Sequence, residues 1–236
     1  MHTISDETIL EILRADTGMA LGCTEPIAAA LAVVKAREVL GARPERISLR
    51  VSGNIYKNGM GVGIPGTDKC GIKVAAALGA VTGSSDKALE VLEGVCDSVA
   101  ASAVEFVSSG GVDVSIAENV DKLYIEAEVS AGGHTATATV EKTHTNITRA
   151  TLDGEQVYKA EEKEKSYSMA DNGRIEGLSV ARLYDFACSV DVERLDDIAR
   201  GAEANWRIAD AGLKKRYGYC LGKMLSAKSR TDSDLM

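Results

Sequence analysis

Two apolar stretches built almost entirely from small side chains constrain the fold of this chain more than any other feature. The first begins at Pro26 (PIAAALAVV) and continues to about Leu40, and the second is KVAAALGAV at residues 73–81. Thr24 suits a helix N-cap, Pro26 a first helical turn and Gly41 a helix end. Because small side chains let helices approach closely, the sequence predicts two buried helices that pack tightly.

Five further segments alternate between apolar and polar residues with a period of two, which is typical of a strand with one buried face. The last four follow one another closely and predict an antiparallel meander. The expected fold class is therefore α+β, with helices packed on a mostly antiparallel sheet, followed by a C-terminal helical segment. The five segments are ISLRVSG (47–53), VDVSIAEN (112–119), KLYIEAEVSA (122–131), HTATATVEK (134–142) and HTNITRATL (144–152).

Composition along the chain predicts three parts. Residues 1–151 are expected to form an N-terminal α+β domain. Residues 152–177, which include KAEEKEKSYSMADNG, are polar enough to be a loop or linker. Residues 178–236 return to helical spacing, with apolar side chains at Leu195, Ile198, Ala202, Trp206 and Ala209.

The charge balance and the cysteines argue against several classes of protein. The 27 Lys and Arg residues face 35 Asp and Glu residues, and the formal net charge of −8 carries no basic cluster, so no nucleic-acid partner is expected. An acidic N-terminus and apolar runs far shorter than ~20 residues argue against a signal peptide and a membrane, and favour a cytoplasmic protein. Five scattered cysteines without a C-x-x-C pair favour neither a disulfide framework nor a self-contained zinc site.

A cysteine stands directly before the first buried helix, in the sequence LGCTEP at residues 21–26. The positive end of the helix dipole and unpaired backbone N–H groups favour a thiolate at Cys23, which suits a nucleophile or a metal ligand. The competing interpretation is a small buried side chain beside a cap, because cysteine is commonly buried. Thr24 and Glu25 can likewise be capping residues only, and the local sequence leaves both interpretations open.

A glycine-rich stretch before the second helix matches G-x-G-x-x-G from Gly61 to Gly66, with Asp86 about twenty residues further on. A dinucleotide site needs that acid after a second strand, whereas Asp86 directly follows a helix, so nucleotide binding is disfavoured. The dipeptide Asn58-Gly59 predicts a hairpin turn.

The same stretch can present backbone N–H groups to a small anion such as an amino-acid carboxylate. Nearby polar side chains that could assist are those of Asn54, Lys57, Asn58 and Thr67. A glycine-rich hairpin whose polar groups only satisfy turns is an equally good interpretation. His144, in the motif THTNI, would point to the opposite face from Thr143 and Thr145 in a regular strand, and a single strand histidine is more often structural than catalytic.

Taken together, three motifs closely resemble the N-terminal half of the L-cysteine desulfidase family, which is related to iron–sulfur L-serine dehydratase alpha chains. They are LGCTEPIAAALA, SGNIYKNGMGVGIPGTDKCGIKVAAALGAVTG and THTNI, in this order and spacing. The resemblance runs through most of the chain. It implies an oxygen-sensitive lyase with a 4Fe-4S cluster that converts L-cysteine and water to pyruvate, sulfide and ammonia, or L-serine to pyruvate and ammonia. No pyridoxal phosphate is expected.

The resemblance also implies roles for residues of these motifs. Three cysteines would hold the cluster and leave one iron open as a Lewis acid, and Cys23 matches the first of these ligands. Glu25, Lys57 and His144 are the implied catalytic residues, although the general base is not assigned among them. The implied substrate-binding residues are Thr24, Asn54, Lys57, Asn58, Gly66, Thr67 and Asn146. The other four cysteines do not stand at the family's ligand positions and are expected to be ordinary thiols.

The family's remaining cluster ligands lie in a C-terminal half that this sequence does not contain. The chain can therefore be a fragment, one subunit of a split enzyme, or a remnant without catalysis, and alone it is expected to be inactive or nearly so. The expected partners are a small amino-acid substrate and the C-terminal half, in cis or as a separate subunit, within an oligomer. The alternative from another class is a non-catalytic amino-acid binding or regulatory module of the same fold.

Overall fold

The computed structural model of the chain describes residues 4–18, 22–160, 178–216 and 220–229. Contacts within it define two units, which we name the sheet unit (residues 20–163) and the helical unit (residues 1–19 and 164–236). Helix α1 (Asp6–Asp16) groups with the helical unit, whereas the sequence placed it in the N-terminal domain. The residues that group with α1 lie at 164–236, and local periodicity cannot reveal contacts over such a distance in the sequence.

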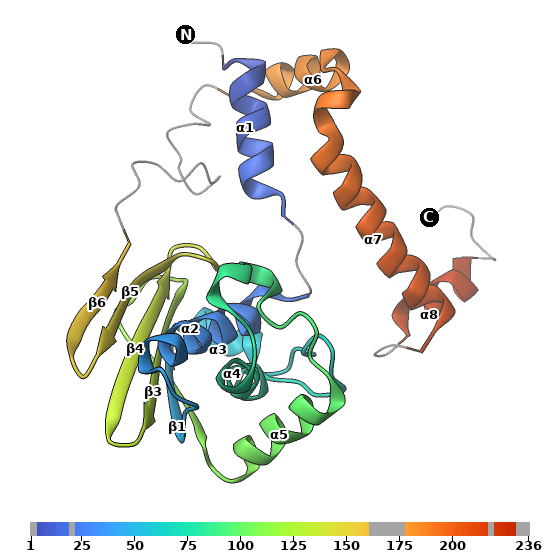
Figure 1. Cartoon of the computed structure of the whole chain (residues 1–236). Helices are drawn as coiled ribbons and strands as arrows, with labels where there is room; N and C mark the ends of the chain where they lie inside the picture. Colours follow the sequence, from blue (N-terminus) through green and yellow to red (C-terminus); the bar gives the residue numbers. More distant parts are fainter. Residues whose placement is uncertain (1–3, 19–21, 161–177, 217–219, 230–236) are drawn as a thin grey trace. The chain divides into compact units, whose positions relative to one another are not determined.

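A six-stranded sheet forms one layer of the sheet unit, in the order β2-β1-β3-β4-β5-β6 (Figure 1). Only β1 and β2 run parallel, and every other neighbouring pair is antiparallel. The predicted α+β class with a mostly antiparallel sheet is therefore confirmed. The strands are β1 (Arg46–Val51), β2 (Val112–Ile116), β3 (Tyr124–Ala131), β4 (His134–Glu141), β5 (Ile147–Leu152) and β6 (Glu155–Lys159).

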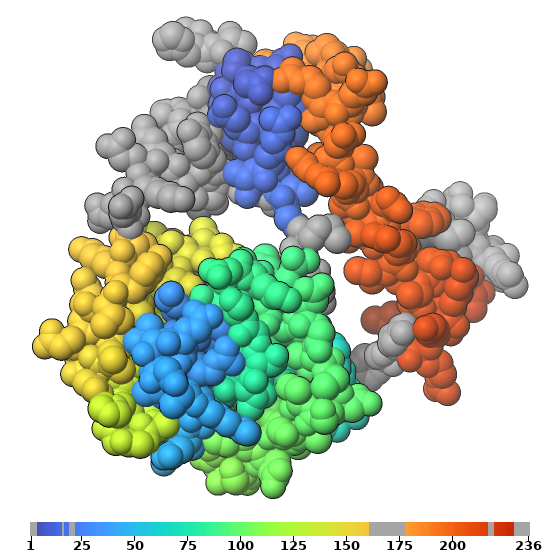
Figure 2. All heavy atoms as spheres, viewed as in Figure 1, coloured from blue at the N-terminus to red at the C-terminus, as the bar shows by residue number. Residues whose placement is uncertain are grey.

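Helix α2 is the central helix of the sheet unit. It lies against β3, β4 and β5, α4 packs on α2, and α5 packs on α4. Figure 2 shows part of α2, in blue, between strands in yellow and helices in green. The close approach predicted from the small residues is confirmed, because a Cβ added to Gly79 would lie 2.6 Å from the carbonyl oxygen of Ala30. The helices are α2 (Thr24–Leu40), α3 (Gly53–Gly59), α4 (Ile72–Val81), η1 (Ser85–Glu90) and α5 (Asp97–Ser108).

Two local predictions in the sheet unit are wrong. Asn58-Gly59 ends α3 and turns no hairpin, because the Ser52 hydroxyl caps that helix by accepting from the Ile55 N–H and Ile55 is buried. Strand β2 does not belong to the meander. It pairs in parallel with β1, since the chain between the two strands crosses over through α3, α4 and α5.

The beginning of the predicted linker forms β6 instead. Asp153 and Gly154 make the turn into this strand with φ values of 49° and 86°, the conformation that an Asp-Gly hairpin favours. Residues 161–177 of the predicted linker lie outside the described residues. His144 lies in the turn between β4 and β5, so strand alternation does not decide which way it points.

The helical unit contains α1, α6 (Val180–Ser189), η2 (Val192–Leu195), α7 (Asp196–Lys214) and α8 (Leu221–Ser229). Ile9 and Leu10 of α1 pack with Phe186 of α6 in a small core. Arg182 ties the same two helices together by donating to the carbonyl oxygen of Ile4 at 2.8 Å. Over the described ranges of both units, no helix has the length and apolar character needed to cross a membrane.

Candidate functional site

The first turn of α2 places Cys23 and Glu25 beside each other. Cys23, and not Thr24 as predicted, is the N-cap of this helix, and its side chain makes no capping hydrogen bond. The Cys23 Sγ instead donates to Glu25 Oε2 at 2.7 Å. Burial raises the pKa of the Cys23 thiol, and the hydrogen bond to Glu25 raises it further. The thiolate expected from the helix dipole is therefore not the favoured form here.

Glu25 is the centre of the site because three separate segments meet at its carboxylate. Its Oε2 accepts from Cys23, and its Oε1 accepts from Asn58 Nδ2 at 2.9 Å. Burial acts to raise the pKa of Glu25, but these two hydrogen bonds, a hydrogen bond from its own backbone N–H and the charge of His144 together outweigh it, so the pKa lies below its ordinary value. A carboxylate in the first turn is also favoured by the helix dipole.

Helix α3 carries Asn54, Lys57 and Asn58 on one face, since they stand at positions i, i+3 and i+4. All three are exposed, and Asn58 reaches Glu25. The helix is anchored beneath them by Ser52, whose hydroxyl donates to the carbonyl oxygen of Lys122 at 2.7 Å. We did not predict this anchor, although a serine three residues before a buried Ile55 is a recognisable N-cap signal.

The turn between β4 and β5 brings His144 near enough to Glu25 for their charges to interact. Burial lowers the pKa of His144 and the charge of Glu25 raises it, with a net lowering, so the half-buried imidazole is favoured in its neutral form. Asn146 supports the turn by donating from Nδ2 to the carbonyl oxygen of Glu141 at 3.0 Å. Asn146 therefore helps to hold the turn that carries His144, and its predicted contact with a substrate stays a prediction.

The glycine-rich loop between α3 and α4 is a small hairpin of its own. Gly63 bridges to Cys70, and Ile64 N donates to the carbonyl oxygen of Lys69 at 2.9 Å. Thr67 Oγ1 donates to the Ile64 carbonyl oxygen at 3.0 Å and accepts from Lys69 N at 3.1 Å, so it closes the loop. The loop follows a helix and not a strand, which disfavours the dinucleotide interpretation further.

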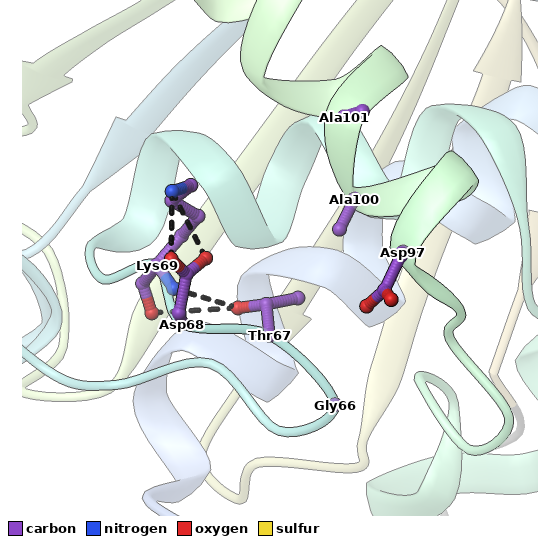
Figure 3. Close-up of a pocket in the computed structure, with 7 residues that line it drawn as sticks. All are labelled: Gly66, Thr67, Asp68, Lys69, Asp97, Ala100 and Ala101. Carbon is purple, nitrogen blue, oxygen red and sulfur yellow. Dashed lines mark hydrogen bonds and ion pairs between the residues drawn. The ribbon is translucent and has the colours of Figure 1, made fainter.

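A surface hollow lies beside this loop, lined by Gly66, Thr67, Asp68, Lys69, Asp97, Ala100 and Ala101 (Figure 3). Lys69 Nζ is paired with Asp68 Oδ1 at 2.9 Å. Asp97 adds a second carboxylate to the lining, so the hollow carries one positive and two negative groups. This balance disfavours the anion-binding role considered for Gly66 and Thr67.

The structure thus gathers four of the residues named from the motifs, Cys23, Glu25, Asn58 and His144, and leaves Lys57 and Asn54 exposed on the same face of α3 as Asn58. Pro65 of the glycine-rich loop borders the site, because a Cβ added to Gly22 would lie 3.5 Å from its Cγ. Gly66 and Thr67 belong to the hollow beside α5 instead.

The donor set for a cluster is incomplete in the described part of the chain. There, no three His, Cys, Asp or Glu residues are grouped so that they could hold a metal ion. Cys70, Cys96, Cys188 and Cys220 are free thiols. Cys96 caps α5, and the Ser98 hydroxyl lowers the pKa of its exposed thiol. The described residues therefore supply no complete set of ligands around Cys23.

Comparison with known proteins finds several bacterial relatives that bear the name UPF0597 protein. One from Oleidesulfovibrio alaskensis is 39% identical over 224 residues, which cover 94% of this chain and 51% of the relative. One from Porphyromonas gingivalis is 36% identical over 230 residues, covering 95% and 53%. One from Clostridium tetani is 36% identical over 220 residues, covering 93% and 52%. The chain spans about half the length of these curated relatives, whose name states no activity.

No family model matches the chain. No solved structure matches it either.

Proposed function

We propose that the chain is the N-terminal portion of an iron–sulfur lyase that converts L-cysteine and water to pyruvate, ammonia and sulfide, or L-serine to pyruvate and ammonia. The observation that carries the proposal is the convergence on Glu25. Hydrogen bonds from Cys23 and Asn58 and the charge interaction with His144 come from three motifs of the resemblance that lie far apart in the sequence. A merely structural cap on α2 would not require all three. We also propose that the protein lies in the cytoplasm.

The residues on α3 would bind the substrate carboxylate. Lys57 is exposed and carries a positive charge on the same helix face as Asn58, so its ammonium can pair with a carboxylate next to Glu25. Asn54 can donate to the same group from one turn away. The neutral His144 can accept a proton, as removal of the α-proton requires, and Glu25 can stabilise the imidazolium that forms.

Cys23 would hold one iron of a 4Fe-4S cluster, whose other ligands would come from the half that the relatives possess and this chain lacks. Such a cluster supplies a Lewis acid for the leaving group. Metal binding needs the thiolate, and the Cys23 proton already points at Glu25 Oε2. That proton would be released to solvent when iron binds, so that Glu25 stays ionised beside His144.

The test uses a chimaera in which this chain replaces the matched stretch of the Oleidesulfovibrio alaskensis relative. After anaerobic reconstitution with iron and sulfide, pyruvate and sulfide are assayed with L-cysteine, and pyruvate with L-serine. We expect turnover that Cys23→Ser abolishes and that Cys96→Ser, a matched change at another helix N-cap, leaves intact. A cluster or turnover unaffected by Cys23→Ser would refute the proposal.

A second candidate is a non-catalytic amino-acid binding module. It is favoured by the protonated, hydrogen-bonded Cys23 thiol, which suits a structural role. Calorimetric titration with L-cysteine and L-serine distinguishes the two, because a binding module should keep its affinity in Cys23→Ser without iron.

A further inference from the structure

One face of α7 is apolar along its whole length and exposed. Ile198, Ala202, Trp206, Ala209 and Leu213 follow one another at intervals of three or four residues, so they form a single stripe. The stripe is about 22 Å long at the helical rise of 1.5 Å per residue. The exposed fraction is 36% for Ile198, 77% for Trp206 and 50% for Leu213. None of the residues of α7 is buried.

The contacts that α7 makes with α1 and Thr17 use other faces, whereas Leu213 at the end of the stripe lies against Gly222 of α8. Gly201 faces Thr17, whose methyl group would lie 3.9 Å from an added Cβ, and Asp197 pairs with Arg14 at 4.0 Å. Charged residues such as Glu203 and Arg207 occupy the side away from the stripe. A helix in contact with water on all sides needs no such separation of apolar and charged faces.

Helix α8 carries an exposed apolar face of its own. Lys223 Nζ donates to the carbonyl oxygen of Lys214, the last residue of α7, at 3.2 Å, which holds the two helices together. Leu221, Met224 and Leu225 share one face of α8, at positions i, i+3 and i+4, and are 57–64% exposed. Contiguous exposed apolar area of this kind marks an interaction surface.

We propose that the stripe on α7, with the apolar face of α8, is the docking surface for the polypeptide that makes up the other half of the relatives. The relatives are about twice as long as the matched stretch, so the rest of each relative is available to cover an exposed apolar surface of the matched part. Each of these matches takes in at least 93% of this chain, so α7 belongs to the shared part. The docking proposal shares with the proposed function the existence of a second half, but it does not depend on the lyase reaction.

Trp206 offers a direct test because it is the only tryptophan of the chain. The chain alone and the chimaera described above are labelled with 5-fluorotryptophan, and the Trp206 signal is assigned with Trp206→Phe. Solvent contact is read from the shift of the fluorine resonance between light and heavy water. We expect the Trp206 fluorine resonance to shift between light and heavy water in the monomeric chain, and to show no such shift in the chimaera.

Variants on neighbouring positions localise the contact. Ala202→Lys places a charge on the stripe, whereas Glu203→Lys places the same side chain on the charged face of α7, and both positions are exposed. When this chain and the unmatched part of the relative are co-expressed as separate chains, Ala202→Lys should abolish their co-purification and Glu203→Lys should not.

Three results would overturn the proposal. Trp206 that stays in contact with solvent in the chimaera would mean that the second half does not cover α7. If Trp206 is already protected from solvent in the monomeric chain, another part of the same chain covers the stripe. If protection of Trp206 appears only when the chain self-associates, a second copy of the chain covers the stripe. None of these readouts depends on turnover, so an inactive chimaera with protected Trp206 would count against the lyase and leave the docking surface standing.

Discussion

Replacing Gly79 with alanine should destabilise the sheet unit by about 2 kcal/mol. The new Cβ would lie 2.6 Å from the carbonyl oxygen of Ala30, which is 0.8 Å closer than the 3.4 Å at which ordinary contact begins. The opposing atom belongs to the backbone of α2, so no rotation of a side chain can relieve the overlap. Ala30 is fully buried, and moving α2 would disturb its packing on the sheet.

The magnitude follows from two opposing effects. Overpacking of a well-packed core costs roughly 1–3 kcal/mol, and a rigid backbone neighbour places Gly79→Ala at the upper end. Alanine is favoured over glycine in a helix by about 1 kcal/mol, which offsets part of that cost. The remaining 2 kcal/mol or so corresponds to a roughly 30-fold larger unfolding constant.

Amide hydrogen exchange of peptides from α2 and α4, followed over a urea series, measures this effect in the sheet unit alone. Gly53→Ala is the control, because Gly53 is also helical and an added Cβ meets nothing within 4 Å. The control should change the free energy of unfolding by less than about 0.5 kcal/mol. Exchange in Gly79→Ala that is as slow as in the unaltered chain would show that the helix contact relaxes freely, and would refute the reasoning.

Other predictions concern titration and backbone conformation. The pKa of Glu25 lies below its ordinary value of 4.5. Its contribution to stability is therefore complete above pH 4.5 and is lost as the pH falls through the folded-state pKa. Glu25→Gln should flatten this acid dependence of the free energy of unfolding, measured by urea titration. The same variant should lower the pKa of the Cys23 thiol, seen as thiolate absorbance at lower pH than in the unaltered chain, with Cys23→Ser as the blank. Burial, and after it a hydrogen bond to the Glu126 carboxylate, raises the pKa of Tyr124 from 10.0 to about 12. The contribution of Tyr124 to the stability of the fold is therefore complete below pH 10 and is lost as the pH rises toward 12. Tyr124→Phe should remove this loss of stability at high pH. Gly83→Ala should lower the urea midpoint, because Gly83 has φ +89° and an added Cβ would lie 2.5 Å from the Val91 carbonyl oxygen.

Local sequence was a good guide wherever short-range forces decide the structure. The small-residue runs predicted α2 and α4, since helix periodicity and caps act within a few residues, and the alternating segments predicted the strands and the α+β class. It failed at Asn58-Gly59, where the Ser52 cap and the burial of Ile55 outweighed a turn signal. It also failed at β2, because strand direction depends on a crossover that no local pattern encodes.

The sequence by itself determined which residues of the site were worth naming, through motifs around Cys23, Asn58 and His144. Only the tertiary structure decided that these three meet at Glu25, and that Thr67 closes its own loop instead. It also bears on the protonation state of Cys23, for which the sequence left two interpretations open. The helix dipole acts through local geometry and favours the thiolate, but burial and a carboxylate accepting the thiol proton depend on how the chain folds around it, and they favour the thiol.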